Sequence, residues 1–392
     1  MAEWLSIIGI GEDSRAGLSA ASLAALDDAA HVIGAPRHLA LAGLADDPRA
    51  QVWPVPFAVD PVLALRGTPV AMLVSGDPFW FGAGASLAQH LTPGEWITHP
   101  APSTFSWAAA RLGWRIEEVA CLGLHAAPFE RLRPVMHHGA RAIVLLRDGA
   151  APGALAGWLT EQGFGASPCH VLEALGGPNE RIRTVQAADY AFDAVAPVAM
   201  AIAFAGGPGL PRVAGLPDTL FAHDGQITKR PVRALTLSAL APRPGERLWD
   251  IGAGSGSIGI EWALAGGHAV AIERHPARAA TIRANVARFG LDHRITVIET
   301  DSARLPDLPV PQAVFVGGGA SAALIGDLWT RIPVGTRLVI NAVTLETEAL
   351  LIETQARLGG DLLRIDLAQA GPLGSMRGWD AARTVTQWSV VR

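Results

Sequence analysis

Short apolar segments alternate with stretches of helical spacing through the first half of the chain. The first apolar segment, residues 5–10, ends in a Gly-Ile-Gly turn, and residues 18–30 follow with apolar positions at helical spacing. This alternation predicts a mostly parallel α/β sheet. From about residue 115 the pattern changes, and we expect a second α/β lobe in the same half. Further strands are predicted at residues 31–33, 70–74, 141–146, 167–172 and 198–204, and helices at 82–90 and 105–112.

The second half shows a more regular α/β series. A helix at 231–240 precedes a strand at 247–251, and a glycine-rich turn leads from this strand into a helix at 257–264. Two strand candidates near the C-terminus, 362–368 and 384–391, are expected to form an antiparallel edge of the sheet. The other strands are predicted at 269–273, 295–299, 313–316 and 337–341, and the other helices at 276–289, 320–331 and 346–358.

A cluster of turn-forming residues lies near the middle of the chain. Residues 206–211 read Gly-Gly-Pro-Gly-Leu-Pro and Pro217 follows, which is the densest turn signal in the sequence. The length of 392 residues suits two domains of ordinary size. We therefore predict a first domain over residues 1–205, built from two α/β lobes, a linker at 206–218 and a second domain over 219–392.

Composition and charge narrow the classes of function. Half of the residues are apolar and only 17% are charged, which is ample for large cores. Residues 1–205 hold 12 Arg and no Lys against 19 acidic residues, and residues 206–392 hold 19 basic against 17 acidic residues. Neither half has the dense basic face that nucleic-acid binding requires. Lys229 is the only lysine, so the chain has no Walker-type phosphate loop.

Metal sites and membrane segments are also not expected. The two cysteines, Cys121 and Cys169, are too few for a disulfide framework or a four-cysteine zinc site, and no histidine has ligand partners at suitable spacing. The N-terminus lacks the basic start of a signal peptide. The longest charge-free stretches, 194–211 and 308–326, are interrupted by Gly and Pro. We expect a soluble, cytoplasmic protein that binds neither a membrane nor nucleic acid.

A glycine-rich loop in the second half has the features of a nucleoside site. Residues 250–259 read DIGAGSGSIG at a predicted strand-to-helix turn. Closely spaced glycines let the backbone approach a ligand, and the helix N-terminus offers unpaired N–H groups. Glu273 closes the next strand, where a carboxylate accepts the ribose hydroxyls of an adenosine-containing cofactor. Asp301 and Ser302 follow the strand after that, where an adenine edge is expected.

Two cofactors compete for this loop. Residues 254–259 also fit the dinucleotide pattern G-x-G-x-x-G, which is weak evidence alone. Asp250 before the first glycine, the G-x-G-x-G spacing and the acidic Asp301 favour S-adenosylmethionine (SAM). If this segment were only a glycine turn between a strand and a helix, all of these features would have to occur together by chance. After the predicted strand 313–316 the chain reads Gly-Gly-Gly at 317–319. Methylases of exocyclic amines typically carry Asn/Asp-Pro-Pro-Tyr/Phe at this place. Three glycines leave room for a bulky substrate, and they are equally compatible with a simple tight turn.

Three loops of the first half follow predicted strands. They are Gly-Ile-Gly at 9–11, Ser-Gly-Asp-Pro at 75–78 and Pro-Ser-Thr-Phe at 102–105. The carboxyl ends of parallel strands share one edge of a sheet, where ligands bind. Asp77 either binds a ligand there or caps the following helix, and the residues alone do not decide between these roles.

The three loops, together with Ala-Ala-Ala-Arg-Leu-Gly at 108–113, resemble the tetrapyrrole (corrin/porphyrin) methylase family, whose members bind SAM in a cleft between two α/β lobes. The second half resembles the decarboxylating methyltransferase domain of the cobalamin pathway. This second resemblance rests on Gly-Gln-Ile-Thr-Lys-Arg at 225–230, the glycine loop, Glu273, Asp301-Ser302, the glycines 317–319, Pro-Leu-Gly at 372–374 and Val-Thr-Gln-Trp-Ser at 385–389. The two resemblances cover nearly the whole chain, and their fused order resembles the bifunctional methyltransferases of aerobic cobalamin biosynthesis.

The resemblance implies two SAM sites, one in each domain. In the first domain, Gly76, Asp77, Ser103 and Thr104 would face SAM. Glu273 stands where the family often has Asp, and Ser302 where it often has Ala; both changes should be tolerated. Carried over by motif, the residues of the second site would be Thr228, Gly252, Ala253, Gly254, Ser255, Gly256, Glu273, Asp301 and Ser302.

The implied substrate is a precorrin, a reduced tetrapyrrole rich in carboxylate side chains. It would be methylated at two meso carbons and lose the carboxyl group of its ring C acetate, giving precorrin-8X. Methyl transfer of this kind depends mainly on alignment, so we expect arginines that bind substrate carboxylates and few classical catalytic residues. The candidates are Arg230, Arg233 and Arg377. The resemblance also implies one methylation per half, decarboxylation in the C-terminal half and a homo-oligomer.

Two other readings stay open on the residues alone. A nicotinamide-dependent reductase of a tetrapyrrole would use the overlapping dinucleotide pattern, and a non-catalytic SAM-binding module would bind the cofactor without turnover. Neither explains why two different methylase-like halves share one chain.

Overall fold

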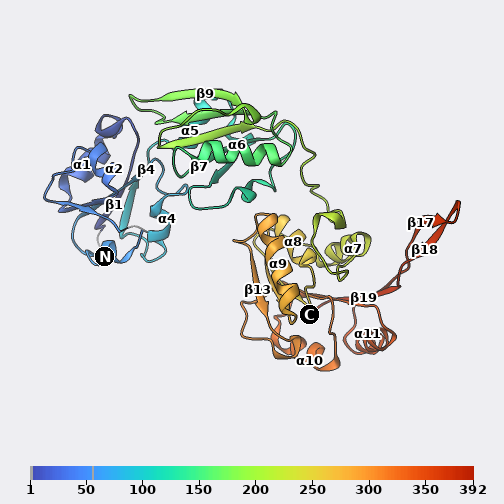
Figure 1. Ribbon diagram of the computed structural model, residues 1–392. Helices are drawn as coiled ribbons and strands as arrows, with labels where there is room; N and C mark the ends of the chain where they lie inside the picture. Colours follow the sequence, from blue (N-terminus) through green and yellow to red (C-terminus); the bar gives the residue numbers. More distant parts are fainter. Residues whose placement is uncertain (1–2, 55–56) are drawn as a thin grey trace. The chain divides into compact units, whose positions relative to one another are not determined.

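The computed structural model describes residues 3–54 and 57–392. The chain divides into two compact units, and Figure 1 shows that each contains both helices and strands. Unit 1 comprises Met1–Phe129 and Val135–Pro208, and unit 2 comprises Glu130–Pro134 and Gly209–Arg392. Each unit has its own sheets and its own hydrophobic core.

The first lobe of unit 1 is built on five parallel strands. They are β1 (Leu5–Ile10), β2 (His31–Gly34), β3 (Ala50–Val52), β4 (Val70–Ser75) and β5 (Trp96–His99), with helices α1 (Ala20–Asp28), α2 (Pro36–Leu41), α3 (Asp60–Leu63) and α4 (Ala83–Ala88) and the 3-10 helix η1 (Ser14–Gly17). The sheet order is β3-β2-β4-β1-β5, and every pairing is parallel. The central strands β1 and β4 are apolar along almost their whole length because helices and loops cover both faces. This confirms the expected parallel α/β sheet.

The second lobe of unit 1 has a mixed sheet. Its elements are β6 (Ala120–Gly123), β7 (Arg141–Leu146), β8 (Pro168–Glu173), β9 (Arg181–Gln186), β10 (Val198–Ala203), α5 (Thr104–Leu112), α6 (Ala151–Glu161), η2 (Ile116–Glu118) and η4 (Ala187–Asp189). The 3-10 helix η3 (Phe129–Leu132) lies mostly in the Glu130–Pro134 segment of unit 2. The order is β6-β7-β10-β8-β9, in which only the β6–β7 pair is parallel. The expected second lobe is confirmed. Strand β9 was not expected because it is an edge strand of mainly polar residues without a continuous apolar face.

Unit 2 contains one seven-stranded sheet. Its strands are β11 (Arg247–Ile251), β12 (His268–Glu273), β13 (Ile295–Glu299), β14 (Ala313–Val316), β15 (Arg337–Ala342), β16 (Asp361–Ile365) and β19 (Val385–Val391). The order is β13-β12-β11-β14-β15-β19-β16, with β11 to β15 parallel. Strand β19 runs antiparallel to both β15 and β16, which confirms the expected antiparallel edge.

Helices cover both faces of this sheet. They are α7 (Arg230–Leu240), α8 (Ser257–Leu264), α9 (Pro276–Arg288), α10 (Ala322–Arg331) and α11 (Leu345–Leu358), with η5 (Asp218–Leu220) and η6 (Ser302–Arg304) in the loops. Residues of α7, α8 and α9 pack with Trp262 in one core cluster, and residues of α10 and α11 pack with Trp388 in another. The strand order reverses direction at β11, between β12 and β14, and ligands bind in the crevice at such a switch point.

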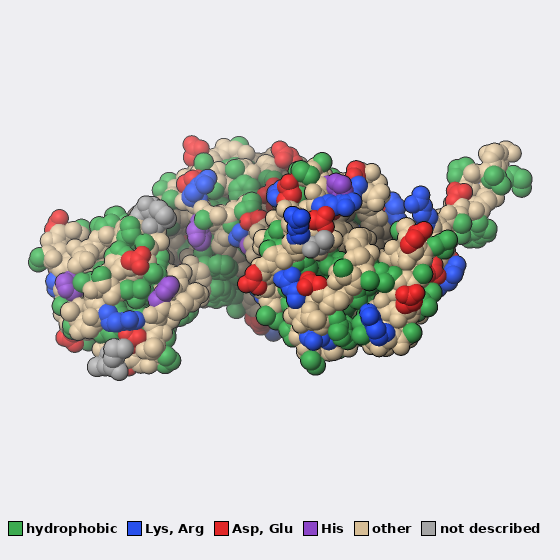
Figure 2. All heavy atoms as spheres, turned by 90° about the horizontal axis from the view of Figure 1, so that it is seen from below, with side chains coloured by type: hydrophobic (Ala, Val, Ile, Leu, Met, Phe, Trp, Pro, Cys, Tyr) green, Lys and Arg blue, Asp and Glu red, His purple; other side chains and the backbone are tan. Residues whose placement is uncertain are grey.

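A two-stranded hairpin projects from the body of unit 2 (Figures 1 and 2). Its strands are β17 (Ala368–Leu373) and β18 (Met376–Ala381), joined at Gly374, which has a φ of 60°. The sequence predicted a single strand at 362–368, so the hairpin is a correction to that expectation. The pattern does not predict it because both of its faces are exposed: Leu373, Met376 and Trp379 are all exposed, Trp379 by 77%.

Across the described ranges, no helix is both long and apolar enough to cross a membrane.

Candidate functional site

The glycine loop of unit 2 leads from β11 into α8 at the switch point of the sheet. Gly252, Gly254 and Gly256 have φ values of 68°, 60° and 76°, a region that residues with a side chain rarely adopt. Gly256 is the N-cap of α8, and so the first N–H groups of the helix face the loop. The local sequence therefore builds the backbone cradle that the glycine spacing predicted.

Two of these glycines also pack too closely for any side chain. A Cβ at Gly252 would lie 2.7 Å from the carbonyl oxygen of Gly318, in the loop after β14. A Cβ at Gly256 would lie 2.8 Å from the side chain of Ile282 on α9. The loops after β11 and β14 thus meet at one edge of the sheet, as the sequence positions required.

Glu273 ends β12 and turns its carboxylate toward the glycine loop. Its side chain is only 4% exposed, and its two oxygens accept the backbone N–H of Gly254 at 2.9 Å and of His275 at 3.0 Å. The strand after it ends at Glu299, which is exposed. An acidic side chain fixed beside a glycine loop is the arrangement that recognises ribose hydroxyls.

Asp250 lies beneath the loop and is almost fully buried. Its Oδ2 accepts the N–H of Gly259 at 3.0 Å, while its Oδ1 has no hydrogen-bond partner. Burial raises the pKa of Asp250 to about 7, and the negative charge of Glu273 adds to the rise, whereas the Gly259 N–H opposes it. The buried hydroxyl of Ser255 also lacks a partner. Unpaired buried polar atoms at one loop indicate that a polar ligand completes the site.

The segment before α7 is fixed by a buried ion-pair cluster around Arg233. The Arg233 guanidinium, which is 0% exposed, donates to Glu261 at 2.6 Å and to Asp218 at 2.9 Å. It also donates to the carbonyl oxygens of Leu216 and Thr228. Glu261 in turn accepts the N–H groups of Gly215 and Leu216. This placement corrects the expectation for Arg233, because its donors are used inside the fold and cannot reach a substrate carboxylate.

The other two arginine candidates are exposed. Arg230 is the first residue of α7, next to the N-cap Lys229, and so lies just after Thr228. Arg377 lies on β18 of the projecting hairpin. Both remain open to solvent, but the structure does not bring Arg377 to the glycine loop.

Asn285 is a site residue that the sequence reasoning missed. It lies on α9, is 1% exposed, and its side-chain amide joins two loops. Its Oδ1 accepts the N–H of Ala222, and its Nδ2 donates to the carbonyls of Ala222 and Ser255, each at 2.9 Å. A polar residue on the apolar face formed by Ile282, Val286 and Phe289 was the signal that could have revealed it.

The remaining predicted positions of unit 2 lie along the same sheet edge. Asp301 and Ser302 follow β13, and Ser302 begins η6. A Cβ at Gly319 would lie 3.2 Å from the Ser302 hydroxyl oxygen, so this loop meets the glycines after β14. Thr228 contributes its carbonyl to the Arg233 cluster and is half-buried.

The three predicted loops of unit 1 also come together. A Cβ at Gly9 would lie 1.9 Å from the Gly76 carbonyl oxygen and 2.7 Å from the Ala101 nitrogen. Gly76 itself has a φ of 56°. Asp77 accepts the N–H of Phe79 at 2.8 Å, so it stabilises a local turn, and α4 begins only at Ala83. The alternative in which Asp77 caps that helix is thereby removed.

Ser103 and Thr104 begin α5. Ser103 is the N-cap, is buried, and its hydroxyl accepts the N–H of Ser106 at 3.1 Å. Thr104 is the first helical residue. The serine thus has a capping function at the sheet edge where the resemblance places a cofactor contact.

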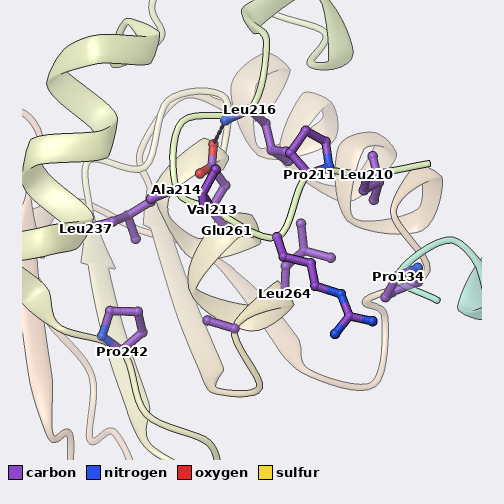
Figure 3. A pocket seen from close by; sticks show the side chains of 12 residues that line it. Pro134, Leu210, Pro211, Val213, Ala214, Leu216, Leu237, Pro242, Glu261 and Leu264 are labelled. Carbon is purple, nitrogen blue, oxygen red and sulfur yellow. Dashed lines mark hydrogen bonds between the residues drawn. The ribbon is translucent and has the colours of Figure 1, made fainter. Parts of the chain in front are cut away.

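A separate pocket of about 360 Å³ lies elsewhere on unit 2 (Figure 3). Residues 210–214 of the chain segment that enters the unit form one wall, and Leu237, Pro242, Leu264 and Ala265 from α7, α8 and their C-terminal loops contribute to the rest. None of the glycine-loop residues lines it. The pocket is therefore not the nucleoside site.

No group of three or more His, Cys, Asp or Glu side chains suited to a metal ion occurs in the described ranges 3–54 and 57–392.

The donor set at the glycine loop fits a nucleoside cofactor. It combines three left-handed glycines, the Glu273 carboxylate at the next strand and the unpaired polar atoms of Asp250 and Ser255. Because the loop and α8 present backbone N–H groups at the same edge, a ligand with both hydroxyl and charged groups finds partners there.

Two family models match the chain. Residues 219–392 match a precorrin methyltransferase domain, and residues 5–191 match the tetrapyrrole (corrin/porphyrin) methylases. The order of these matches along the chain is the order of the two sequence resemblances.

Curated relatives extend over the whole chain or over part of it. A protein of Sinorhizobium sp. is 49% identical over 396 residues, covering 98% of this chain and 96% of the relative; it is named precorrin-6Y C(5,15)-methyltransferase [decarboxylating]. A shorter protein of Saccharolobus solfataricus is 31% identical over 156 residues, covering 38% of this chain and 78% of the relative. It is named probable cobalt-precorrin-6B C(15)-methyltransferase (decarboxylating).

Among solved structures, the C-terminal domain of precorrin-6Y C5,15-methyltransferase from Rhodobacter capsulatus is 56% identical. It covers 47% of this chain and 100% of its own, with a TM-score of 0.46. The identity over nearly the full length of the Sinorhizobium protein, with both family models in order, places this chain in the decarboxylating precorrin-6Y C5,15-methyltransferase family.

Proposed function

We propose that this protein transfers methyl groups from SAM to C5 and C15 of precorrin-6Y and removes the carboxyl group of the ring C acetate, in cobalamin biosynthesis. The observation that carries the proposal is the 49% identity over 98% of the chain to a relative of that name. The glycine loop and Glu273 supply the cofactor chemistry that such a reaction needs.

We further propose that each domain holds one SAM site, with a first domain over residues 1–205, a linker at 206–218 and a second domain over 219–392. At the second site, Glu273 binds the ribose, the N–H groups of the glycine loop and α8 hold polar groups of the cofactor, and Asp301 and Ser302 border the adenine. At the first site, the Gly76–Asp77 loop and the start of α5 form the cofactor contacts. The glycines at both sheet edges support this assignment, since each allows close backbone approach.

Bound SAM supplies an electrophilic methyl group, and the protein's part is alignment. The nucleophile would be an enamine-like meso carbon of the tetrapyrrole: its electron pair would form the new C–CH₃ bond as the S–CH₃ bond breaks, the neutral thioether would leave, and the cationic macrocycle would lose a proton. The glycine loop and Glu273 would hold the cofactor, and Arg230, which is exposed at the start of α7, would hold a substrate carboxylate. Holding both reactants in a near-attack arrangement lowers the barrier without a strong base.

We assign decarboxylation and C15 methylation to the second domain. The shorter Saccharolobus protein joins the two activities in its name and aligns over 156 residues, 38% of this chain, while residues 219–392 match a precorrin methyltransferase domain. Loss of carbon dioxide breaks the bond between the acetate methylene and its carboxyl carbon, and the electron pair passes into the conjugated macrocycle. The protein favours this step by desolvating the carboxylate, after which the new carbanion centre takes a proton.

We also propose that the protein is a cytoplasmic homo-oligomer. The β17–β18 hairpin exposes Leu373, Met376 and Trp379 on an arm that projects from unit 2. Apolar side chains concentrated on a projecting arm are typical of a surface that packs against another copy.

Mass spectrometry of the purified protein with reduced precorrin-6 and SAM tests the proposal. We expect a product with two added methyl groups and one carbon dioxide lost. The same chain with Gly254→Val should give at most one methyl group and retain the carboxylate. No methylated product despite SAM binding would favour the non-catalytic module, and an absorbance change with NADPH alone would favour the reductase.

A further inference from the structure

A cluster of polar side chains joins the carboxyl ends of three strands in the first lobe of unit 1. Arg37 lies just after β2, at the start of α2. Its Nη1 donates to the carboxylate of Glu12, which lies just beyond β1, and its Nη2 donates to the hydroxyl of Ser75 at 2.8 Å. Ser75 is the last residue of β4 and immediately precedes Gly76. One guanidinium thus contacts the loop after β1 and the last residue of β4.

His38 holds the Ser75 hydroxyl from its other side. It is buried, packs edge-on against Trp53 with ring centroids 5.4 Å apart, and its Nε2 lies 2.8 Å from the Ser75 hydroxyl. Burial lowers the pKa of His38 to about 4, and the charge of Arg37 contributes, so the ring is neutral near pH 7. The Ser75 oxygen accepts from Arg37 Nη2 and is also hydrogen-bonded to His38 Nε2, so the hydroxyl is held between the two side chains. The guanidinium is therefore held in one orientation.

Arg37 can still donate a hydrogen bond to a further anion. Its side chain is 40% exposed, and its Nε–H has no acceptor within the described part of the chain. Burial lowers the pKa of Arg37, which reflects incomplete solvation of its charge. Arg15 in the same lobe is 43% exposed but pairs with Asp27 of α1 and has no contact with Ser75. Of these two arginines, Arg37 is the one bonded to the residue before the Gly76–Asp77 loop.

We infer that Arg37 binds a carboxylate of the tetrapyrrole substrate in the first domain, with Glu12, Ser75 and His38 positioning its guanidinium. The inference rests on the proposed function, which supplies a polycarboxylate substrate. A guanidinium held at a sheet edge beside a glycine loop suits a planar carboxylate better than a mobile lysine does. Glu12 holds the guanidinium before substrate arrives, and the substrate carboxylate takes the Nε–H.

The test uses the full chain with Arg37→Gln and Arg37→Lys, and Arg15→Gln as a control of matched exposure. The KM for precorrin-6Y should rise about tenfold to a hundredfold in R37Q, because a charged hydrogen-bonded contact is lost, and less in R37K. The kcat at saturating substrate and the SAM affinity should stay close to those of the wild type. Added salt should raise the KM of the wild type more steeply than that of R37Q.

Several outcomes would overturn the inference. Three results would show that Arg37 has a structural role and does not bind substrate. They are an unchanged KM in folded R37Q, an equal salt dependence of the KM in R37Q and the wild type, and a loss of SAM binding parallel to the rise in KM. Tryptophan-fluorescence titration with precorrin-6Y in the absence of SAM separates this result from the proposed function. If the wild type binds the tetrapyrrole without turnover, the activity fails but weaker binding by R37Q still supports the inference. If the wild type does not bind it, both fail.

Discussion

The carboxylate of Glu273 accepts the backbone N–H of Gly254 at 2.9 Å, although 19 residues separate them along the chain. This bond joins the end of β12 to the turn between β11 and α8. It places an acidic side chain against the glycine loop. A ribose hydroxyl would either replace the Gly254 N–H as the donor to this carboxylate or donate to it as well.

Replacing Glu273 should weaken SAM binding at the second site. Glu273→Ala removes the charged acceptor, and we expect an affinity about tenfold to a hundredfold lower. Isothermal titration calorimetry measures this. Glu299→Ala is the matched control, because Glu299 pairs with Glu273 in the sheet register but is exposed. Equal effects of the two substitutions would contradict the assignment of Glu273.

A side chain at Gly254 should abolish SAM binding at the same site. Gly254→Val forces a β-branched residue to a φ of 60° and brings its Cβ to about 3.1 Å from the Gln226 carbonyl oxygen. Gly326→Ala on α10 is the control, since its Cβ would meet open space. Titration with SAM should then show one site fewer for G254V than for G326A. An undiminished number of sites would place the second cofactor elsewhere.

Asp250 should make the stability of the SAM-free protein depend on pH. Its pKa is about 7 in the folded state, against an ordinary value of 3.8, so the folded state binds this proton more tightly than the unfolded chain does. The stabilising contribution is complete below pH 3.8 and is lost as the pH rises toward 7, by up to about 1.4 kcal/mol per pH unit.

Asp250→Asn carries no titrating group at that position, so its stability relative to the wild type should increase as the pH rises across this window. Thermal melts of both proteins between pH 5 and pH 8 measure the difference. A difference that does not vary with pH would show that Asp250 titrates normally.

Removing Arg233 should destabilise unit 2 strongly. Arg233→Met leaves the Glu261 carboxylate buried without its countercharge, which typically costs about 3–5 kcal/mol of the free energy of unfolding. The exposed pair Arg278–Asp224 provides the control, and Arg278→Met should cost less than about 1 kcal/mol. Urea denaturation measures both. A comparable, small effect of the two substitutions would refute a structural role for the buried cluster.

Polar substitutions on the hairpin should change the oligomeric state. The double variant Leu373→Ser and Trp379→Ser removes two exposed apolar side chains while leaving the body of unit 2 intact. Light scattering after size exclusion should give a smaller mass for this variant than for the wild type. Ile352→Ser, on the exposed face of α11, is the control. An unchanged mass would place any oligomer interface elsewhere.

The sequence predicted those parts of the site whose chemistry is local. The strand, the glycine loop and the helix after it lie within residues 247–264, and the apolar strand pattern determines where Glu273 falls. Parallel strands then bring their carboxyl ends together, which is why the three loops around Gly9, Gly76 and Ala101 were expected to meet.

Other parts depend on partners that are remote in the sequence. Arg233 was expected to bind substrate because it lies near a predicted loop at the start of the helix 231–240, but its partner Glu261 lies 28 residues away and holds the side chain inside the fold. The cluster of Arg37 with Ser75 spans 38 residues, and Asn285 reaches Ala222 across 63. The hairpin was missed for the opposite reason, because strands exposed on both faces need no apolar alternation.

The amide of Asn285 has a practical consequence for fragments of this protein. It hydrogen-bonds to both Ala222 and Ser255, and Arg233 donates to the carbonyls of Thr228 and Leu216. The segment before α7 is therefore fixed against the glycine loop. A fragment starting at Arg230 would contain the glycine loop, Glu273 and the loops after β13 and β14, yet the glycine loop would have lost its contacts with residues 215–228. We therefore expect a stable fragment of unit 2 to begin upstream of Gly215, well before the first glycine of the loop.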